Sequence, residues 1–315
     1  MRIVSLLACV ALSCAAAGSH APDGPDTIVF RDACDGSAAA ALPGGLFVIA
    51  NDETNMLRVY RPVGRRPIAA RNMSAFLGLA RKGEADIEAA ATIGTVTYWI
   101  TSHARDGQGR ERPERQRLFA TRWDGEALLP VGQPRDDLRR AMLAAPGLGL
   151  RAVADKGPEA GGINIEGLAD TGHGDLLIGL RSPLIGPRGL AMIVPLRNAA
   201  GLVGAGAPAR FGAPVLLDLG GRGIRSLERV GDRFLVVAGP ASGSGRFTLY
   251  DWSGRFGERP RALPAPIGDM TVEAMIRLSD SRLLLVSDDG SPLCKASPRA
   301  GKRFRGRVMA MPALG

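Results

Sequence analysis

The chain has 315 residues, of which 45% are hydrophobic and 5% aromatic, and its formal net charge is +9. This length allows one large domain or two medium ones. The basic excess, nearly all arginine, serves either solubility or attraction to an anionic ligand, and without a recognised binding motif it argues against nucleic acid as a partner.

Residues 1–21 have the features of a secretory signal peptide: one arginine, a short apolar stretch and then small residues. No later stretch is long and apolar enough for a transmembrane helix. We therefore expect a periplasmic or secreted protein, and the alternative is a lipoprotein anchored through Cys14. The mature chain keeps only Cys34 and Cys294, near its two ends, and in an oxidising compartment we expect them to form a disulfide.

One short pattern recurs along the chain: an apolar run, a turn residue and a second apolar run. Its five copies cover residues 36–52, 86–100, 164–180, 223–239 and 271–289, the first copy being the faintest. Each copy predicts two buried strands joined by a tight hairpin. Repetition of such a unit predicts a radial or stacked repeat fold.

Further apolar segments follow the copies. A third segment follows every copy, at 55–62, 116–123, 190–196, 246–252 and 304–312, and a weaker fourth follows the first four, at 66–72, 127–133, 214–220 and 260–266. The fifth unit lacks a fourth segment, whereas a strand predicted over 26–32 belongs to no unit. We predict an all-β fold: one β-propeller domain over 26–315, with five four-stranded blades and the last blade completed by the N-terminal strand.

A six-bladed propeller is the alternative. Two insertions between predicted strands are expected to be helical. Residues 74–83 begin with Ser74 as a candidate helix cap, and residues 134–149 place apolar residues on one helical face.

Alignment of the five copies on their hairpins places one polar residue at the start of each innermost strand. These residues are Ser37, Glu88, Glu166, Arg225 and Glu273, and we expect them to form a ring around the central channel. An apolar residue would serve packing alone, and a buried charge needs a partner. The ring therefore predicts ion pairs and a bound cation, water or ligand, and the alternative is a purely structural ring.

The second strands should end on the same face of the propeller, which adds Asp52, His103, Arg181 and Asp288 to the ring. Asp86, just before an innermost strand, belongs to this face as well. Candidate catalytic residues are His103, Glu88 and Glu166, with His103 as a general acid or base or, alternatively, a structural histidine. Candidate ligand-binding residues are Ser37, Asp52, Arg181, Arg225, Glu273 and Asp288.

Carboxylates without a group of histidines or cysteines favour Ca²⁺ or Mg²⁺ over zinc or copper. The predicted metal ligands are Glu88, Glu166 and Glu273, and Ca²⁺ is the expected cofactor.

Several stretches, among them "CDGSAAAAL", "NIEGLAD", "LLIGLRSPL" and "LDLGGRGIRSLE", resemble a bacterial family known only as a domain of unknown function. The resemblance covers roughly residues 34–310. In single blades, the "IEGLA…LLIG" pattern is also similar to the phytase-like, esterase-like propeller family. That second resemblance implies hydrolysis of a phosphate or carboxylic ester with bound calcium.

Three functions are compatible with these features. The first is a divalent-cation-dependent hydrolase whose arginines bind a small anionic (phospho)ester. The second is a non-catalytic propeller that binds a ligand or a partner at the same face, and the third is a glycan-active enzyme with paired carboxylates. The sequence leaves open whether any reaction is catalysed, and we expect a monomer.

Overall fold

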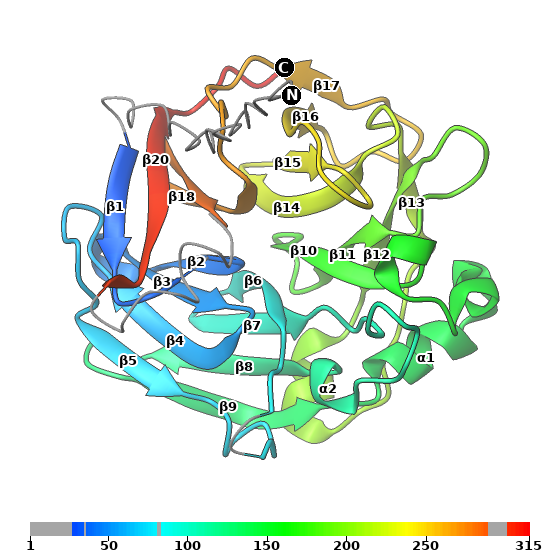
Figure 1. Cartoon of the computed structure of the whole chain (residues 1–315), viewed down its shortest axis with the longest axis horizontal. Coiled ribbons are helices and arrows are strands. Elements are labelled where there is room, and N and C mark those ends of the chain that lie inside the picture. The colour runs from blue at the N-terminus through cyan, green and yellow to red at the C-terminus, as the bar shows by residue number, and fades with distance from the viewer. Residues whose placement is uncertain (1–26, 35, 81–82, 289–300) are drawn as a thin grey trace, which may run out of the picture.

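The computed structural model describes residues 27–34, 36–80, 83–288 and 301–315. Within these residues, strands β1 to β20 form five antiparallel four-stranded sheets. The sheets are arranged as blades around a central axis (Figure 1). The predicted all-β, five-bladed propeller is therefore confirmed.

The blades follow one another along the chain, each running from an innermost to an outermost strand. The first two blades contain β2 (Ala38–Leu42), β3 (Leu46–Asn51), β4 (Thr54–Tyr60) and β5 (Ala69–Asn72), then β6 (Ile87–Ile93), β7 (Val96–Thr101), β8 (Leu118–Trp123) and β9 (Leu128–Arg135). The third and fourth contain β10 (Asn164–Asp170), β11 (Leu176–Ser182), β12 (Ala191–Leu196) and β13 (Val215–Leu217), then β14 (Gly223–Val230), β15 (Arg233–Gly239), β16 (Thr248–Trp252) and β17 (Arg261–Leu263). The fifth contains β18 (Val272–Ser279), β19 (Arg282–Ser287), β20 (Arg303–Ala310) and β1 (Thr27–Arg31).

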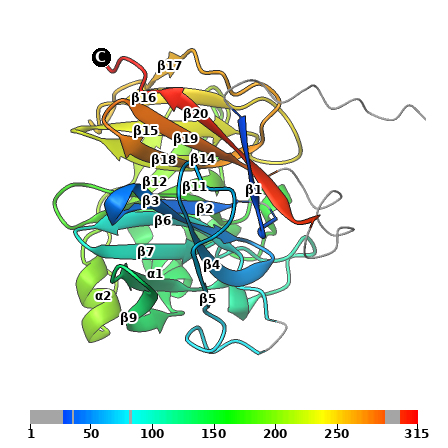
Figure 2. The ribbon, with the colours of Figure 1, turned by 90° about the vertical axis from the view of Figure 1, so that its left-hand side faces the viewer.

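The N-terminal strand closes the propeller, as predicted. Every residue of β1 has a partner in β20 (Figures 1 and 2). Phe30 of β1 stacks on Phe304 of β20 with ring centroids 5.0 Å apart, and its edge contacts Phe47 and Tyr60 of the first blade. This strand therefore joins the last blade to the first and removes the free edge that β20 would otherwise expose.

Buried apolar side chains lie between neighbouring blades. Among the described residues they form five clusters, one at each blade interface. The innermost strands pack against one another around the axis, and their short hairpins use glycine at positive φ, as at Gly94 and Gly231. Glycine at the first position of a two-residue hairpin matches the twist of the flanking strands.

Two short α-helices, α1 (Leu138–Ala144) and α2 (Ala199–Ala205), cover the cluster between the second and third blades. Helix α1 lies in the segment 134–149 for which a helix was expected, and α2 was not predicted. No helix in the described part of the chain is long and apolar enough to cross a membrane. Single 3₁₀ turns cover Pro43–Gly45, Pro113–Arg115, Pro146–Leu148, Leu150–Val153 and Pro158–Ala160.

The helix expected over 74–83 is absent from the described part of that segment, because residues 74–78 form consecutive turns. Ser74 does not cap a helix there. Its N–H donates to Oδ1 of Asn72, and its hydroxyl accepts a hydrogen bond from Asn55. Gly78 has a φ of 66°, in the left-handed region that ends such a segment.

Three predictions fall on residues outside the described part of the chain. These are the signal peptide over 1–21, the lipid anchor at Cys14 and the contribution of Cys294 to a disulfide. Cys34 itself is buried in the connection between β1 and β2. Export and the Cys34–Cys294 disulfide therefore stay predictions.

Candidate functional site

A β-bulge carries the ring residue in four of the five blades. The register of the innermost strand against its neighbour shifts at Glu88 in β6, Glu166 in β10, Arg225 in β14 and Glu273 in β18. In the first blade, Ser37 lies just before β2, whose ladder with β3 is regular. A bulge leaves one residue unpaired and changes the direction of its side chain. The charged side chains can therefore point away from the packed faces of the blades.

Arg225 lies between two ring glutamates. Its Nε is 2.7 Å from Oε2 of Glu166, and its Nη2 forms an ion pair with Glu273. Glu166 also contacts Arg181, whose Nη1 lies 3.1 Å from Oε1, and the side-chain amide of Asn164, which donates to Oε1 at 3.0 Å. The arginines expected to bind an anion therefore already face carboxylates, and an anionic ligand would have to compete with those carboxylates.

Glu88 and Asp52 lack the partners that the other ring acids have. Within the described part of the chain, Glu88 forms no hydrogen bond or ion pair with another residue. Oδ1 of Asp52 is buried without a hydrogen-bond partner among the described residues. These two carboxylates account for the negative charge of the ring that no arginine balances.

Burial and crowding of the acids raise their pKa values. Burial, reinforced by the charges of Asp86 and Glu166, raises the pKa of Glu88 well above its usual range. Burial likewise raises the pKa of Glu273, although Arg225 acts in the opposite direction. Burial and the charge of Asp288 raise the pKa of Asp52 to about 7. Burial and mutual repulsion therefore favour the protonated forms of these three carboxyl groups, and a bound cation would favour the ionised forms.

Asp86 has partners of its own. Its carboxylate accepts a hydrogen bond from the hydroxyl of Ser102 and lies 3.1 Å from Nη1 of Arg115. Its φ of 62° is in the left-handed region, which is uncommon for a residue other than glycine. Arg115 was not predicted, because the loop over 105–117 is rich in arginine throughout and nothing marks this one out.

His103 does not join the carboxylate cluster. It is fully buried, and its Nδ1 lies 2.8 Å from the carbonyl oxygen of Thr101. Its Nε2 has no hydrogen-bond partner among the described residues. Burial lowers the pKa of His103 to about 4, and the charges acting on it are those of Arg139 and Arg117. These surroundings favour a structural histidine over a general acid or base paired with Glu88 or Glu166.

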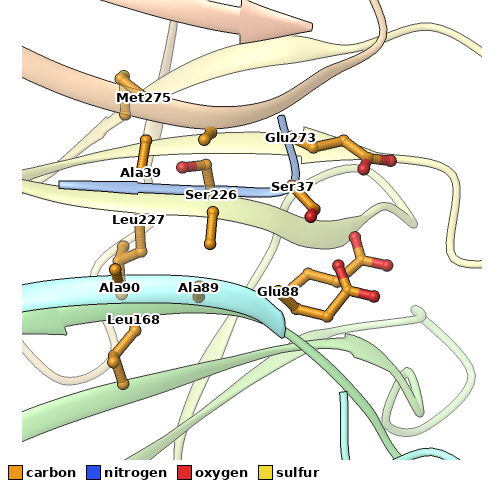
Figure 3. Close-up of a pocket in the computed structure, with 13 residues that line it drawn as sticks. Ser37, Ala39, Glu88, Ala89, Ala90, Leu168, Ser226, Leu227, Glu273 and Met275 are labelled. Atoms are coloured by element: carbon orange, nitrogen blue, oxygen red, sulfur yellow. The ribbon is translucent and has the colours of Figure 1, made fainter. Parts of the chain in front are cut away.

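The ring borders a cavity of about 10 Å³ on the propeller axis, which is room for about one water molecule. In Figure 3, the side chains of Ser37, Glu88 and Glu273 point toward the same end of this cavity. Glu166 also lines it. The Ser37 hydroxyl donates to the carbonyl of Ile87 in the next blade at 3.0 Å. Ser37 therefore links two blades.

Apolar side chains lie at the other end of this cavity. They are Leu168, Leu227 and Met275, from three successive innermost strands, and each is at most 2% exposed (Figure 3). The same three side chains belong to the apolar clusters between blades.

The carboxylates do not form an oxygen cage for a metal ion. Within the described residues, no group of three or more His, Cys, Asp or Glu side chains is arranged to hold a metal. Glu166 and Glu273 are both turned toward Arg225, whereas Ca²⁺ takes about six to eight oxygen ligands. The expected calcium role of Glu88, Glu166 and Glu273 stays a prediction that this arrangement does not support.

Comparison with solved structures finds other proteins at low sequence identity. The glutaminyl cyclase of Myxococcus xanthus is 10% identical with a TM-score of 0.48, over 91% of this chain and 95% of that one. The PQQ-bound aldose sugar dehydrogenase of Streptomyces coelicolor is 13% identical with a TM-score of 0.43, over 90% of this chain and 98% of that one. At these values neither likeness carries an argument about activity.

No curated protein matches this chain. A family model does match part of it, and the matched part contains three of the ring residues: Glu166, Arg225 and Glu273. Residues 157–281, from the third blade into the fifth, match the family described as "Protein of unknown function (DUF3616)".

Proposed function

We propose that this protein is a ligand-binding propeller whose carboxylate cluster takes a small organic cation, such as the protonated amine of a ligand. The cluster consists of Asp52, Asp86, Glu88, Glu166, Glu273 and Asp288. The observation that carries the proposal is Glu88: a half-buried carboxylate that has no partner in the described chain and stands among other acids. An ammonium group would supply the missing positive charge and the missing hydrogen bonds.

The charge balance of the ring supports a cationic ligand. Arg225 and Arg181 are used by Glu166 and Glu273, and Arg115 is used by Asp86. The unbalanced negative charge comes from Glu88 and Asp52. Their raised pKa values indicate that ionising these two groups is costly without a cation. Cation binding should therefore displace protons, and affinity should rise as the pH increases through about 7.

The same observations favour binding over hydrolysis. The cavity within the ring has room for about one water molecule or an ammonium-sized head group. His103, the candidate general acid or base, contacts Thr101 and Arg139 and none of the ring carboxylates within the described residues. The divalent-cation-dependent hydrolase and the glycan-active enzyme remain alternatives. Metal binding at Glu88, Glu166 and Glu273 would support the hydrolase.

Thermal unfolding with methylammonium chloride as the probe tests the proposal, with sodium chloride at equal ionic strength as the reference. Methylammonium should raise the Tm of the wild type saturably, more at pH 8 than at pH 6. A ligand at about 100 times its Kd stabilises the folded state by about 2.7 kcal/mol. Glu88→Gln should abolish the shift. Glu126→Gln, the same change at an exposed position of the second blade, should keep it.

Equal effects of methylammonium and sodium, or an undiminished shift in Glu88→Gln, would overturn the proposal. Calcium chloride is a separate arm of the same experiment. Saturable stabilisation by Ca²⁺ that is lost in Glu88→Gln would favour the hydrolase instead, and a screen on chromogenic phosphoesters should follow.

A further inference from the structure

A second, larger cavity lies at the opposite end of the innermost strands. Its volume is about 300 Å³, and all five innermost strands contribute to its wall. Leu168, Leu227 and Met275 lie between it and the carboxylate ring. The volume falls at the lower end of the range for small-molecule pockets, so this mouth of the channel is large enough for a ligand that the ring cavity excludes.

The two sides of this cavity differ in chemistry. The first and second blades contribute small apolar side chains, among them Ala40, Ala41, Ala90 and Ala91. The third, fourth and fifth blades contribute charged residues, which are Asp170, Glu228, Arg229 and Arg277. A ligand that fills this space has to combine a short apolar body with a polar group at one end.

The charged side consists of two arginines and two acids, and one of the arginines is available to a ligand. Asp170 is neutralised by Arg229, whose Nε lies 2.6 Å from Oδ1 and 3.0 Å from Oδ2. Arg277 forms its only ion pair within the described chain with Asp280, at 3.4 Å, and Asp280 is fully exposed. Exposed pairs of this kind contribute little to stability, so the Arg277 guanidinium is available to a ligand.

Glu228 adds a hydrogen-bond donor beside Arg277. Its carboxyl accepts a hydrogen bond from the backbone of Arg277, and burial raises its pKa to about 8. The charged groups around it are Asp170, which raises the pKa, and Arg229 and Arg277, which lower it. The walls from the first and second blades contribute no titratable side chain to the cavity. At neutral pH the protonated form of the Glu228 carboxyl therefore predominates.

We infer that this mouth of the channel is a second binding site, which takes a small organic carboxylate. The ligand carboxylate lies between the Arg277 guanidinium and the Glu228 carboxyl, and the apolar body of the ligand lies against the alanines of the first and second blades. The inference does not depend on the function proposed for the carboxylate ring, because none of the ring residues lines the larger cavity.

Methyl NMR of protein labelled at alanine methyl groups tests this site, with sodium butyrate as the probe. The methyl signals of Ala40, Ala41, Ala90 and Ala91 should shift saturably, whereas that of Ala199, a buried residue of α2, should not. Butylammonium chloride, which has the same apolar body and the opposite charge, should cause no saturable shift. Arg277→Gln should weaken butyrate binding at least tenfold, and Arg282→Gln, at an exposed arginine of β19, should leave it unchanged.

The pH dependence of butyrate binding distinguishes this site from a cavity that attracts anions only through its positive charge. If Glu228 must be protonated, wild-type affinity for butyrate should fall about tenfold for each pH unit above its pKa. Glu228→Gln should bind butyrate at pH 7 as the wild type does and keep that affinity at pH 9. The inference is overturned if butyrate shifts no cavity methyl saturably, if butylammonium shifts them equally, or if Arg277→Gln binds as well as the wild type.

Discussion

Glu166 and Arg225 meet across the boundary between the third and fourth blades, with Oε2 of Glu166 2.7 Å from Nε of Arg225. The two side chains are 5% and 6% exposed, and each is carried by a β-bulge of an innermost strand. Breaking a buried pair by removing one partner costs more than the intact pair contributes, because it leaves an uncompensated charge. This contact therefore makes the ring important for folding as well as for binding.

Arg225→Met should destabilise the protein by about 3–5 kcal/mol at neutral pH, because Glu166 and Glu273 then lose their shared cation. Urea unfolding at pH 7 measures the effect. The loss should shrink as the pH falls, because burial raises the pKa of Glu273 and its protonated form needs no cation. Arg66→Met removes an arginine that is 69% exposed and should cost about 1 kcal/mol or less. Equal losses in the two variants would contradict the buried ion-pair network.

Asp52→Asn should stabilise the protein above neutral pH. Burial raises the pKa of Asp52 from 3.8 to about 7, so the folded chain holds this proton more tightly than the unfolded chain does. Stability is therefore lost as the pH rises from about 4 to about 7, and the penalty is complete above that range. Asparagine avoids the charge. The variant should match the wild type near pH 4 and exceed it at pH 8 by on the order of a few kcal/mol.

Urea unfolding across this pH range checks the sign. A variant that is less stable than the wild type at pH 8 would show that Asp52 is held ionised by a partner. Glu126→Gln, at an exposed position, should follow the wild-type curve throughout.

Much of the fold could be predicted because each repeat unit carries the same strand and hairpin pattern. The ring residues were found because they lie at a similar place relative to the hairpin, and in four blades that place is a β-bulge. The pairing of Arg225 with Glu166 and Glu273 could not be predicted. It depends on how far neighbouring blades rotate about the axis, and no local pattern encodes that angle.

Other parts of the two sites needed the closed structure. The sequence places His103 at the end of a strand on the correct face, but its φ of 54° and its hydrogen bond to Thr101 leave it fully buried and apart from the acids. Glu228 and Arg277 look like ordinary polar residues near hairpins. Only closure of the ring of blades brings them together with alanines more than 130 residues away in the chain.

A disulfide between Cys34 and Cys294 should be present in the exported protein. It would close a loop of roughly 260 residues, and on the chain-entropy model such a loop is worth roughly 5 kcal/mol before native strain is subtracted. Intact-mass measurement with and without a reducing agent, followed by peptide mapping, should recover the two cysteines in one linked peptide pair. Alkylation of both thiols without prior reduction would contradict the prediction.

Closure by β1 should depend on Phe30. This side chain is fully buried, stacks on Phe304 and contacts Phe47 and Tyr60, so it joins the fifth blade to the first. Phe30→Ala should cost about 3–5 kcal/mol, because the cavity cannot be refilled by neighbouring aromatic rings fixed in two blades. Phe256→Ala makes the same change at a residue that is 73% exposed, and urea unfolding should show a loss within about 0.5 kcal/mol.

The Phe30→Ala variant should also unfold in a defined order. Since β1 pairs with β20 alone, loss of the aromatic contacts should release this strand before the propeller unfolds as a whole. Limited trypsin digestion should then cut after Arg31 in the Phe30→Ala variant at urea concentrations where the wild type and Phe256→Ala resist. Cleavage at Arg31 that appears only together with global unfolding would mean that β1 and the blades form a single cooperative unit.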